Sequence, residues 1–142
     1  AIFPRAIVDG HEYVDGSIAD SVPFERAMEK GCDRVLIVLT KPADEPATDY
    51  RKMRILLSKL FEQDCPELFD AMMTRFDRYG EQARRMTALA ETGGAMIIRP
   101  ERSYVKAFDM NSEKLDVAYD EGRAMAGALK DKILNFVGGT ER

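Results

Sequence analysis

Hydrophobic residues change their spacing near residue 50, and the change predicts two kinds of structure. Before that point they occur in short runs. Residues 5–9 and 12–15 predict two short strands joined by a turn at Asp9-Gly10. The run "RVLIVLT" at 34–40 predicts a third strand. It lacks polar alternation, which is typical of a strand covered on both faces in a parallel sheet.

A short helix is expected between the second and third of these strands. Asp20 or Ser21 could cap its start, and Pro23 suits the first turn because its missing N–H is not needed there. Gly31 is placed to end it. The first 40 residues therefore predict strand, turn, strand, helix and buried strand in that order.

Beyond a proline-rich, acidic loop at 41–49, apolar residues recur at steps of three and four, which predicts helices. One helix should span 50–61, and another should begin at Asp64 or Pro66 and end at Gly93-Gly94. The residues expected to face inward are Tyr50, Met53, Leu56, Leu57, Leu60, Phe61, Leu68, Phe69, Met72, Phe76, Tyr79, Ala83, Met86 and Ala90.

The remainder alternates between strand and helix signals. "AMIIRP" at 95–100 predicts a second buried strand, and 103–110 is ambiguous, with a short edge strand as one reading. A last helix should start at Asn111 or Ser112 and end at Gly138-Gly139. Its expected inward residues are Leu115, Tyr119, Met125, Leu129, Ile133 and Phe136.

Composition indicates an ordinary globular chain and excludes several classes of function. The 142 residues are 45% hydrophobic and 32% charged, with a net charge of −4 and no basic stripe, so nothing favours nucleic acid. No apolar run approaches the ~20 residues that span a bilayer, and no secretory signal opens the chain. One histidine and two unrelated cysteines make zinc a poor candidate and fit a cytoplasmic setting. The sequence implies no cofactor and no metal.

The common catalytic motifs are missing. There is no Gly-x-Ser-x-Gly, no glycine-rich phosphate loop, and only His11 to serve a triad. Asp9, Asp15 and Asp20 are too sparse for a calcium-binding loop. Asp9 is explained by the turn, which leaves Asp15. It follows a strand, at the kind of position where sites form in α/β sheets, and could act there as a general base.

Four elements in order around Asp15 resemble the catalytic segment of patatin-like acyl hydrolases. They are "YVDGS" after a strand, "DSVP" opening a helix, the bend "GCDRV", and the apolar strand "LIVL". The later "GAMIIRPE" and "SEKLDVAYDEGRAMA" are similar to the end of bacterial members. The resemblance therefore extends over nearly the whole chain and is most specific over residues 7–40.

The resemblance implies a Ser–Asp dyad without histidine, in the C-terminal part of a three-layer α/β/α fold. Asp15 would be the general base, supported by Gly16 and Ser17, although the family usually has Gly or Ala where Ser17 stands. Residues 1–40 would form the catalytic segment and 41–142 a helical region with one or two further strands. The nucleophilic serine would lie upstream, so this chain alone should be inactive. An opening on Ala1 rather than Met fits a processed protein or a piece of a longer one.

The resemblance also implies a lipid or acyl-ester substrate and possible peripheral contact with a membrane. Arg75, Arg78, Arg84 and Arg85 could face anionic headgroups, or could simply form a solvated face. A partial sheet with unpaired edges should make the isolated chain self-associate. The alternative is a non-enzymatic α/β interaction domain, in which Asp15-Gly16 is only a turn and the helices of 50–90 form a partner surface.

Overall fold

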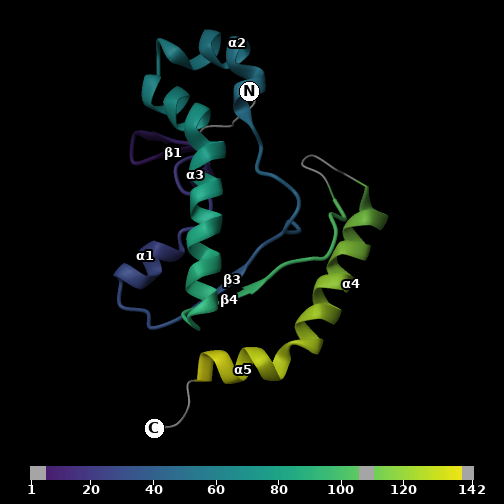
Figure 1. The fold of residues 1–142 in the computed structure, drawn as a ribbon. Coiled ribbons are helices and arrows are strands. Elements are labelled where there is room, and N and C mark those ends of the chain that lie inside the picture. The colour runs from purple at the N-terminus through teal and green to yellow at the C-terminus, as the bar shows by residue number, and fades with distance from the viewer. Residues whose placement is uncertain (1–5, 106–110, 139–142) are drawn as a thin grey trace. The chain divides into compact units, whose positions relative to one another are not determined.

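The structure is a computed structural model that describes residues 6–105 and 111–138. The described residues form helices and two two-stranded sheets, shown as a ribbon in Figure 1. This mixed composition agrees with the general α/β class expected from the sequence. The three-layer patatin-like arrangement stays a prediction.

The chain divides into two units. The first consists of Ala1–Glu25 and Ala47–Arg85, and the second of Arg26–Pro46 and Met86–Arg142. Each unit is therefore built from two stretches that are distant in sequence.

The first unit opens with the expected hairpin. Strands β1 (Ala6–Val8) and β2 (His11–Tyr13) pair antiparallel, with Val8 opposite His11. Asp9 and Gly10 join them with φ values of 50° and 79°. Two positive φ values suit the type I′ turn, whose twist matches that of the strands. The prediction of a turn at Asp9-Gly10 is confirmed, whereas His11 belongs to β2 and not to the turn.

The single helix predicted for residues 50–61 is wrong in detail. The chain instead forms the 3₁₀ helix η2 (Tyr50–Met53), the α-helix α2 (Arg54–Leu57) and the π-helical turn η3 (Ser58–Glu62). A 3₁₀ turn holds three residues and a π turn holds more than an α turn, so no single apolar face continues through all three. Leu57 and Phe61 are consequently buried, whereas three of the residues predicted inward, Met53, Leu56 and Leu60, are exposed.

Helix α3 (Pro66–Glu91) begins at the predicted proline and is followed by Gly93, whose φ of 78° suits the end of a helix. Its first turns complete the core of the first unit. That core combines residues from η1 (Gly16–Ile18), α2, η3 and α3: Ile18, Leu57, Phe61, Phe69 and Met72.

Helix α1 (Phe24–Glu29) also lies where expected, directly after Pro23, with Gly31 at a φ of 93° behind it. The predicted cap is not what the side chains do. The carboxylate of Asp20 accepts a hydrogen bond from Gln82, and the hydroxyl of Ser21 donates to the carbonyl of Ser17. Asp20 thus contacts α3, and Ser21 contacts the segment before α1, so neither hydrogen bond is a cap of α1.

In the second unit, β3 (Val35–Val38) and β4 (Ala95–Ile98) pair in parallel, with Val35 opposite Ala95. The expectation that β3 is covered on both faces is wrong. Val35 and Ile37 are buried, whereas Leu36 and Val38 are 37% and 66% exposed. The exposed face borders a hollow of about 400 Å³, lined by Leu36, Val38, Ile98, Tyr104, Met125 and Ile133 among others, so the described side chains do not cover it fully.

The last predicted helix is two helices, α4 (Ser112–Ala128) and α5 (Lys130–Gly138), separated at Leu129. Asn111 caps α4, because its side-chain oxygen accepts a hydrogen bond from the backbone N–H of Lys114 at 3.1 Å. Neither helix has a fully buried residue. Two residues predicted to face inward, Leu115 and Tyr119, are 46% and 67% exposed.

The short edge strand suggested for 103–110 is not seen in its described part. Residues 103–105 form no strand, and 106–110 lie outside the described residues. Among the helices of the described part, none is long and apolar enough to cross a membrane. Cys32 is exposed and Cys65 is half-buried, and both are free thiols.

Candidate functional site around Asp15

Asp15 lies just beyond β2, at the start of η1. Its backbone is extended, with φ −54° and ψ 119°, and its side chain caps the helix by accepting a hydrogen bond from the backbone N–H of Ser17 at 2.9 Å. The carbonyl of Asp15 also accepts from Ile18 at 3.1 Å. Asp15 itself is exposed. The local sequence therefore presents the carboxylate at a strand end and holds its orientation.

The surroundings of Asp15 favour the ionised carboxylate. The pKa of Asp15 is lowered, first by the hydrogen bond from the backbone N–H of Ser17 and then by the hydroxyl of the same residue. Burial opposes this shift, and the positive charge of Arg75 adds the smallest effect, which also lowers the pKa. Asp15 is thus unprotonated near neutral pH, and the lowered pKa makes it a weaker proton acceptor than a free aspartate.

Gly16 leaves one side of the Asp15 loop open, whereas Ser17 forms hydrogen bonds that hold the loop. A methyl group added at Gly16 would meet no atom within 4 Å, so this side of the Asp15 loop is open to an approaching group. Ser17 acts through its backbone N–H and its hydroxyl on Asp15, and its carbonyl accepts hydrogen bonds from Ser21 and Arg75. The backbone contacts of Ser17 do not require a serine side chain.

Two arginines of α3 fix the loop that follows Asp15. Arg75 donates from Nε to the carbonyl of Ser17 at 3.1 Å. Arg78 donates to the carbonyls of Ala19 and Ile18 at 2.7 and 2.8 Å, and to Ala71 within α3 at 2.7 Å. The carbonyls at this end of η1 thereby find donors, and the backbone beside Asp15 is attached to a long helix.

The next turns of α3 hold the same segment further along. Gln82 is only 7% exposed, and its amide donates to Asp20 at 2.8 Å and to the carbonyl of Val22 at 2.9 Å. Its oxygen accepts from the N–H of Val22 at 3.1 Å. Arg85 forms two hydrogen bonds with Glu25, at 2.6 and 3.1 Å. One face of α3 thus contacts the whole stretch from residue 17 to residue 25.

We call these four residues, Arg75, Arg78, Gln82 and Arg85, the α3 clamp. Sequence reasoning grouped three of them with Arg84 as a basic surface and did not single out Gln82. Arg75, Arg78 and Arg85 form hydrogen bonds with residues 17 to 25, and Arg85 does so while half-exposed. Arg84 is exposed. The spacing of the clamp residues, by three, four and three, is the signal that could have found the clamp, since it places them on one helical face.

The site offers no evident metal centre. Within residues 6–105 and 111–138, no group of three or more His, Cys, Asp or Glu side chains is arranged to hold a metal ion. A polar hollow of about 320 Å³ lies along the clamp, lined among others by Asp20, Glu25, Arg75 and Arg85. Its charges largely pair with one another or with backbone carbonyls. What the arrangement around Asp15 can do chemically is accept a proton from a group that approaches from outside the loop.

Comparison with known proteins adds a family. No curated protein and no solved structure matches the chain. One family model matches residues 65–138, just over half of the chain. The match contains α3 with its clamp, β4, α4 and α5, whereas Asp15 lies before it. The chain therefore belongs to the family described as "Domain of unknown function (DUF6363)".

Proposed function

We propose that this chain is the C-terminal part of a patatin-like lipid acyl hydrolase, with Asp15 as the general base of a Ser–Asp dyad. The observation that carries the proposal is the state of Asp15, a carboxylate that is exposed at a strand end, ionised, and held by Ser17. The α3 clamp supports it, because a general base must keep its position relative to the nucleophile within a fraction of an ångström.

The proposed reaction needs a serine from a segment outside this chain. As the serine oxygen attacks the acyl ester carbonyl, its proton moves to the Asp15 carboxylate. The tetrahedral intermediate collapses, the ester C–O bond breaks, and the leaving alcohol takes the proton from Asp15. Water then attacks the acyl-enzyme, again giving a proton to Asp15. As the bond between the serine oxygen and the acyl carbon breaks, Asp15 returns this proton to the serine oxygen, and the fatty acid is released. On this proposal the chain alone does not turn over, because it lacks the nucleophile.

The test compares two aspartates that are both followed by glycine. In the full-length gene product, Asp15→Asn should lower hydrolysis of a p-nitrophenyl acyl ester by about a hundredfold or more, the scale of lost general-base catalysis. Asparagine keeps the shape and still accepts the hydrogen bond from Ser17, but it cannot take the proton. The matched control is Asp9→Asn, which should leave the rate unchanged because Asp9 serves the hairpin turn.

Circular dichroism should show both variants folded like the wild type. An Asp15→Asn enzyme as fast as the Asp9→Asn enzyme would remove Asp15 from the dyad. A full-length wild type without esterase activity would count against the hydrolase itself.

A binding role is the second candidate, and one observation favours it. The exposed face of β3 and β4 in the second unit borders an apolar hollow of about 400 Å³. Hollows of this size, lined mainly by apolar side chains, commonly hold small ligands or partner side chains. On this reading an inactive wild type would still bind an apolar partner, and Val38→Lys at the mouth of the hollow would abolish that binding while Asp15→Asn would not.

A further inference from the structure

The short helices of the first unit expose a concentration of apolar side chains. Four residues within eight positions of η2, α2 and η3 are large, apolar and in contact with water: Met53 is 37% exposed, Ile55 77%, Leu56 46% and Leu60 45%. They lie outside because the change from 3₁₀ to α to π turns directs other side chains of these helices inward: Leu57 and Phe61 are buried in the core, and Tyr50 packs against it. Clustered exposure of this kind marks an interaction surface more often than a scattered residue does.

Basic residues outnumber acids on the same helices, where Glu62 at the end of η3 is the one acidic residue. From Tyr50 to Phe61 the sequence contains four basic residues and no Asp or Glu, although the whole chain has a net charge of −4. Lys52, Arg54 and Lys59 are exposed and interleaved with the apolar residues. Together with Met53, Ile55, Leu56 and Leu60 they form what we call the 52–60 surface.

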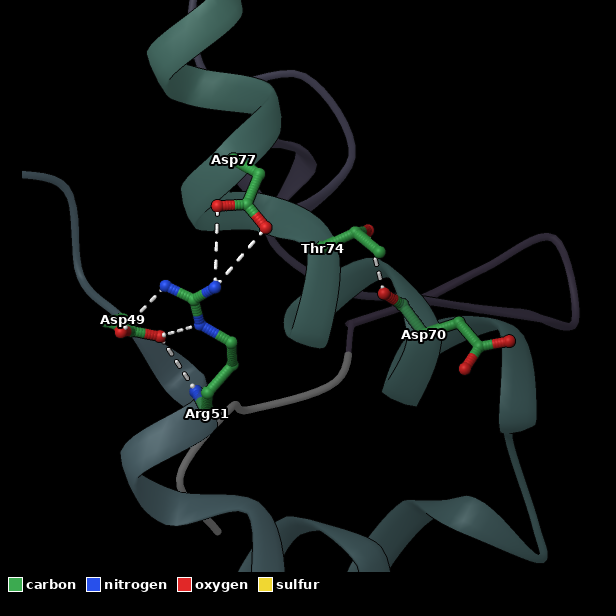
Figure 2. A network of polar contacts seen from close by, with 5 residues as sticks. All are labelled: Asp49, Arg51, Asp70, Thr74 and Asp77. Atoms are coloured by element: carbon green, nitrogen blue, oxygen red, sulfur yellow. Dashed lines mark hydrogen bonds and ion pairs between the residues drawn. The ribbon is translucent and has the colours of Figure 1, made fainter.

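Arg51 does not belong to this surface, because its charge is already used. Figure 2 shows its guanidinium between Asp49 and Asp77, with the closest contacts at 2.7 Å to Asp49 and 3.3 Å to Asp77. It also stacks over the ring of Phe76, at 4.9 Å from the ring centre. Arg51 thus anchors the start of η2 to α3 and gives the 52–60 surface a fixed base.

The surface is hollowed as well as apolar. A depression of about 500 Å³ is bordered by Lys52, Met53, Arg54, Ile55, Leu56 and Lys59, together with Arg51. Its lining combines apolar and cationic side chains, which suits an amphiphile with an acyl part and a negatively charged head. A second copy of the chain does not fit, because a twofold contact would bring the same cations together.

We propose that the 52–60 surface docks on the anionic surface of a lipid bilayer. Ile55, Leu56 and Leu60 would enter the boundary between headgroups and acyl chains, while Lys52, Arg54 and Lys59 would meet lipid phosphates and carboxylates. The inference deepens the proposed function, on which its biological purpose rests, because a lipid hydrolase must reach a substrate that lies in a membrane. Binding itself needs no turnover and can be measured on this chain.

The experiment is sedimentation with vesicles of phosphatidylcholine, with and without phosphatidylserine. The chain should bind the anionic vesicles, and salt should weaken binding because it screens the cations. Replacing Lys52 and Lys59 by Gln should weaken binding about fivefold for each lysine, given about 1 kcal/mol per cation near such a surface. Ile55→Ser should weaken it by roughly tenfold, through lost apolar burial.

Two variants serve as matched controls. Arg84→Gln removes an equal charge from an exposed position of α3, and Val137→Ser removes an aliphatic side chain that is 59% exposed on α5. Both should bind like the wild type. Binding equally to neutral and anionic vesicles, binding that the lysine variants leave unchanged, or no binding at all would each overturn the proposal. None of these results would change the esterase test of Asp15, so the two proposals can fail separately.

Discussion

At the scale of single residues, two Asp-Gly pairs six positions apart take opposite conformations. Asp9 has a φ of 50° and turns the chain between β1 and β2, while Asp15 has a φ of −54° and caps η1. A positive φ is uncommon outside glycine, although aspartate and asparagine tolerate it best. An Asp-Gly pair alone therefore does not show whether its aspartate forms a turn or caps a helix. The residue after the glycine separates them, because only Ser17 is placed to donate to its aspartate.

The contribution of Ser17 to the charge of Asp15 can be measured directly. In Ser17→Ala the hydroxyl is lost and the backbone N–H remains, so the pKa of Asp15 should rise towards its ordinary value of about 3.9 without reaching it. Carboxyl carbon shifts in a pH titration by NMR would report the pKa. Asp49, whose carboxylate is held by Arg51, is an internal control and should not move.

The same lowered pKa has a consequence for stability. Because folding lowers the pKa, the ionised Asp15 stabilises the native state above the unfolded pKa, and this contribution is lost as the pH falls through the folded pKa. Any stability difference between wild type and Ser17→Ala should therefore narrow as the pH falls from about 5 to 2. If the NMR titration gave the same pKa for Asp15 in the wild type and in Ser17→Ala, the Ser17 hydroxyl would contribute nothing to that pKa.

At the scale of elements, α3 packs in the core with one face and holds a neighbouring segment with the adjacent face. Phe69 and Met72 pack in the core of the first unit, while the clamp holds the stretch from residue 17 to residue 25. Side chains that supply hydrogen bonds to a buried or partly buried backbone stabilise it chiefly by preventing unsatisfied groups. In this chain, therefore, a helix of the matched family region contacts a segment that precedes that region.

Gln82 tests this role of α3. Gln82→Leu keeps the volume but leaves the N–H and carbonyl of Val22 without these partners, which should lower the free energy of unfolding by about 1–3 kcal/mol. Urea denaturation followed by circular dichroism would measure it. The matched control is Gln63→Leu at an exposed glutamine, expected to change the value by less than about 0.5 kcal/mol. Equal effects of the two changes would mean that the buried amide does not hold the loop.

At the scale of the whole molecule, the second unit presents an incomplete sheet. Parallel sheets are normally covered on both faces, yet β3 and β4 pair only with each other among the described strands, and Leu36 and Val38 are exposed. Exposed apolar faces and unpaired edges promote association between copies.

We therefore expect the chain to self-associate in a concentration-dependent way. Val38→Lys should shift it towards the monomer, because burying an unpaired lysine in the contact is costly. Size-exclusion chromatography with light scattering would measure the mass. Val137→Lys, at an exposed valine of α5, is the control and should associate like the wild type. A wild type that stays monomeric at micromolar concentration would contradict the expectation.

Local signals account for most of the elements found. Asp9-Gly10, Pro66, Gly93 and Asn111 mark a turn or a helix end, and the structure has a boundary at each. They succeed because turns and caps depend on the residue's own backbone preferences and short-range hydrogen bonds. The two apolar runs form strands as predicted, and the run at 34–40 was expected in a parallel sheet. That these two strands pair with each other is a finding of the structure.

Predictions of burial were wrong where they assumed one regular α-helix over 50–61 or a layer of structure on both faces of β3. Met53, Leu56 and Leu60 are apolar at helical spacing, but the 3₁₀ and π turns rotate them outward. Val38 belongs to an apolar run, but what covers a strand is decided by other parts of the protein. Burial depends on contacts between distant segments, which periodicity within one segment does not contain.

The sequence by itself determined the hairpin, the two apolar strands and the starts of α3 and α4, because each rests on neighbouring residues. Only the tertiary structure decided how the arginines of α3 are used and which cations face solvent. Arg78 and Lys59 are both basic residues on helices, yet one donates to carbonyls some sixty positions away and the other is exposed. A charge is assigned its role by the partner it meets, and those partners come together only when the chain folds.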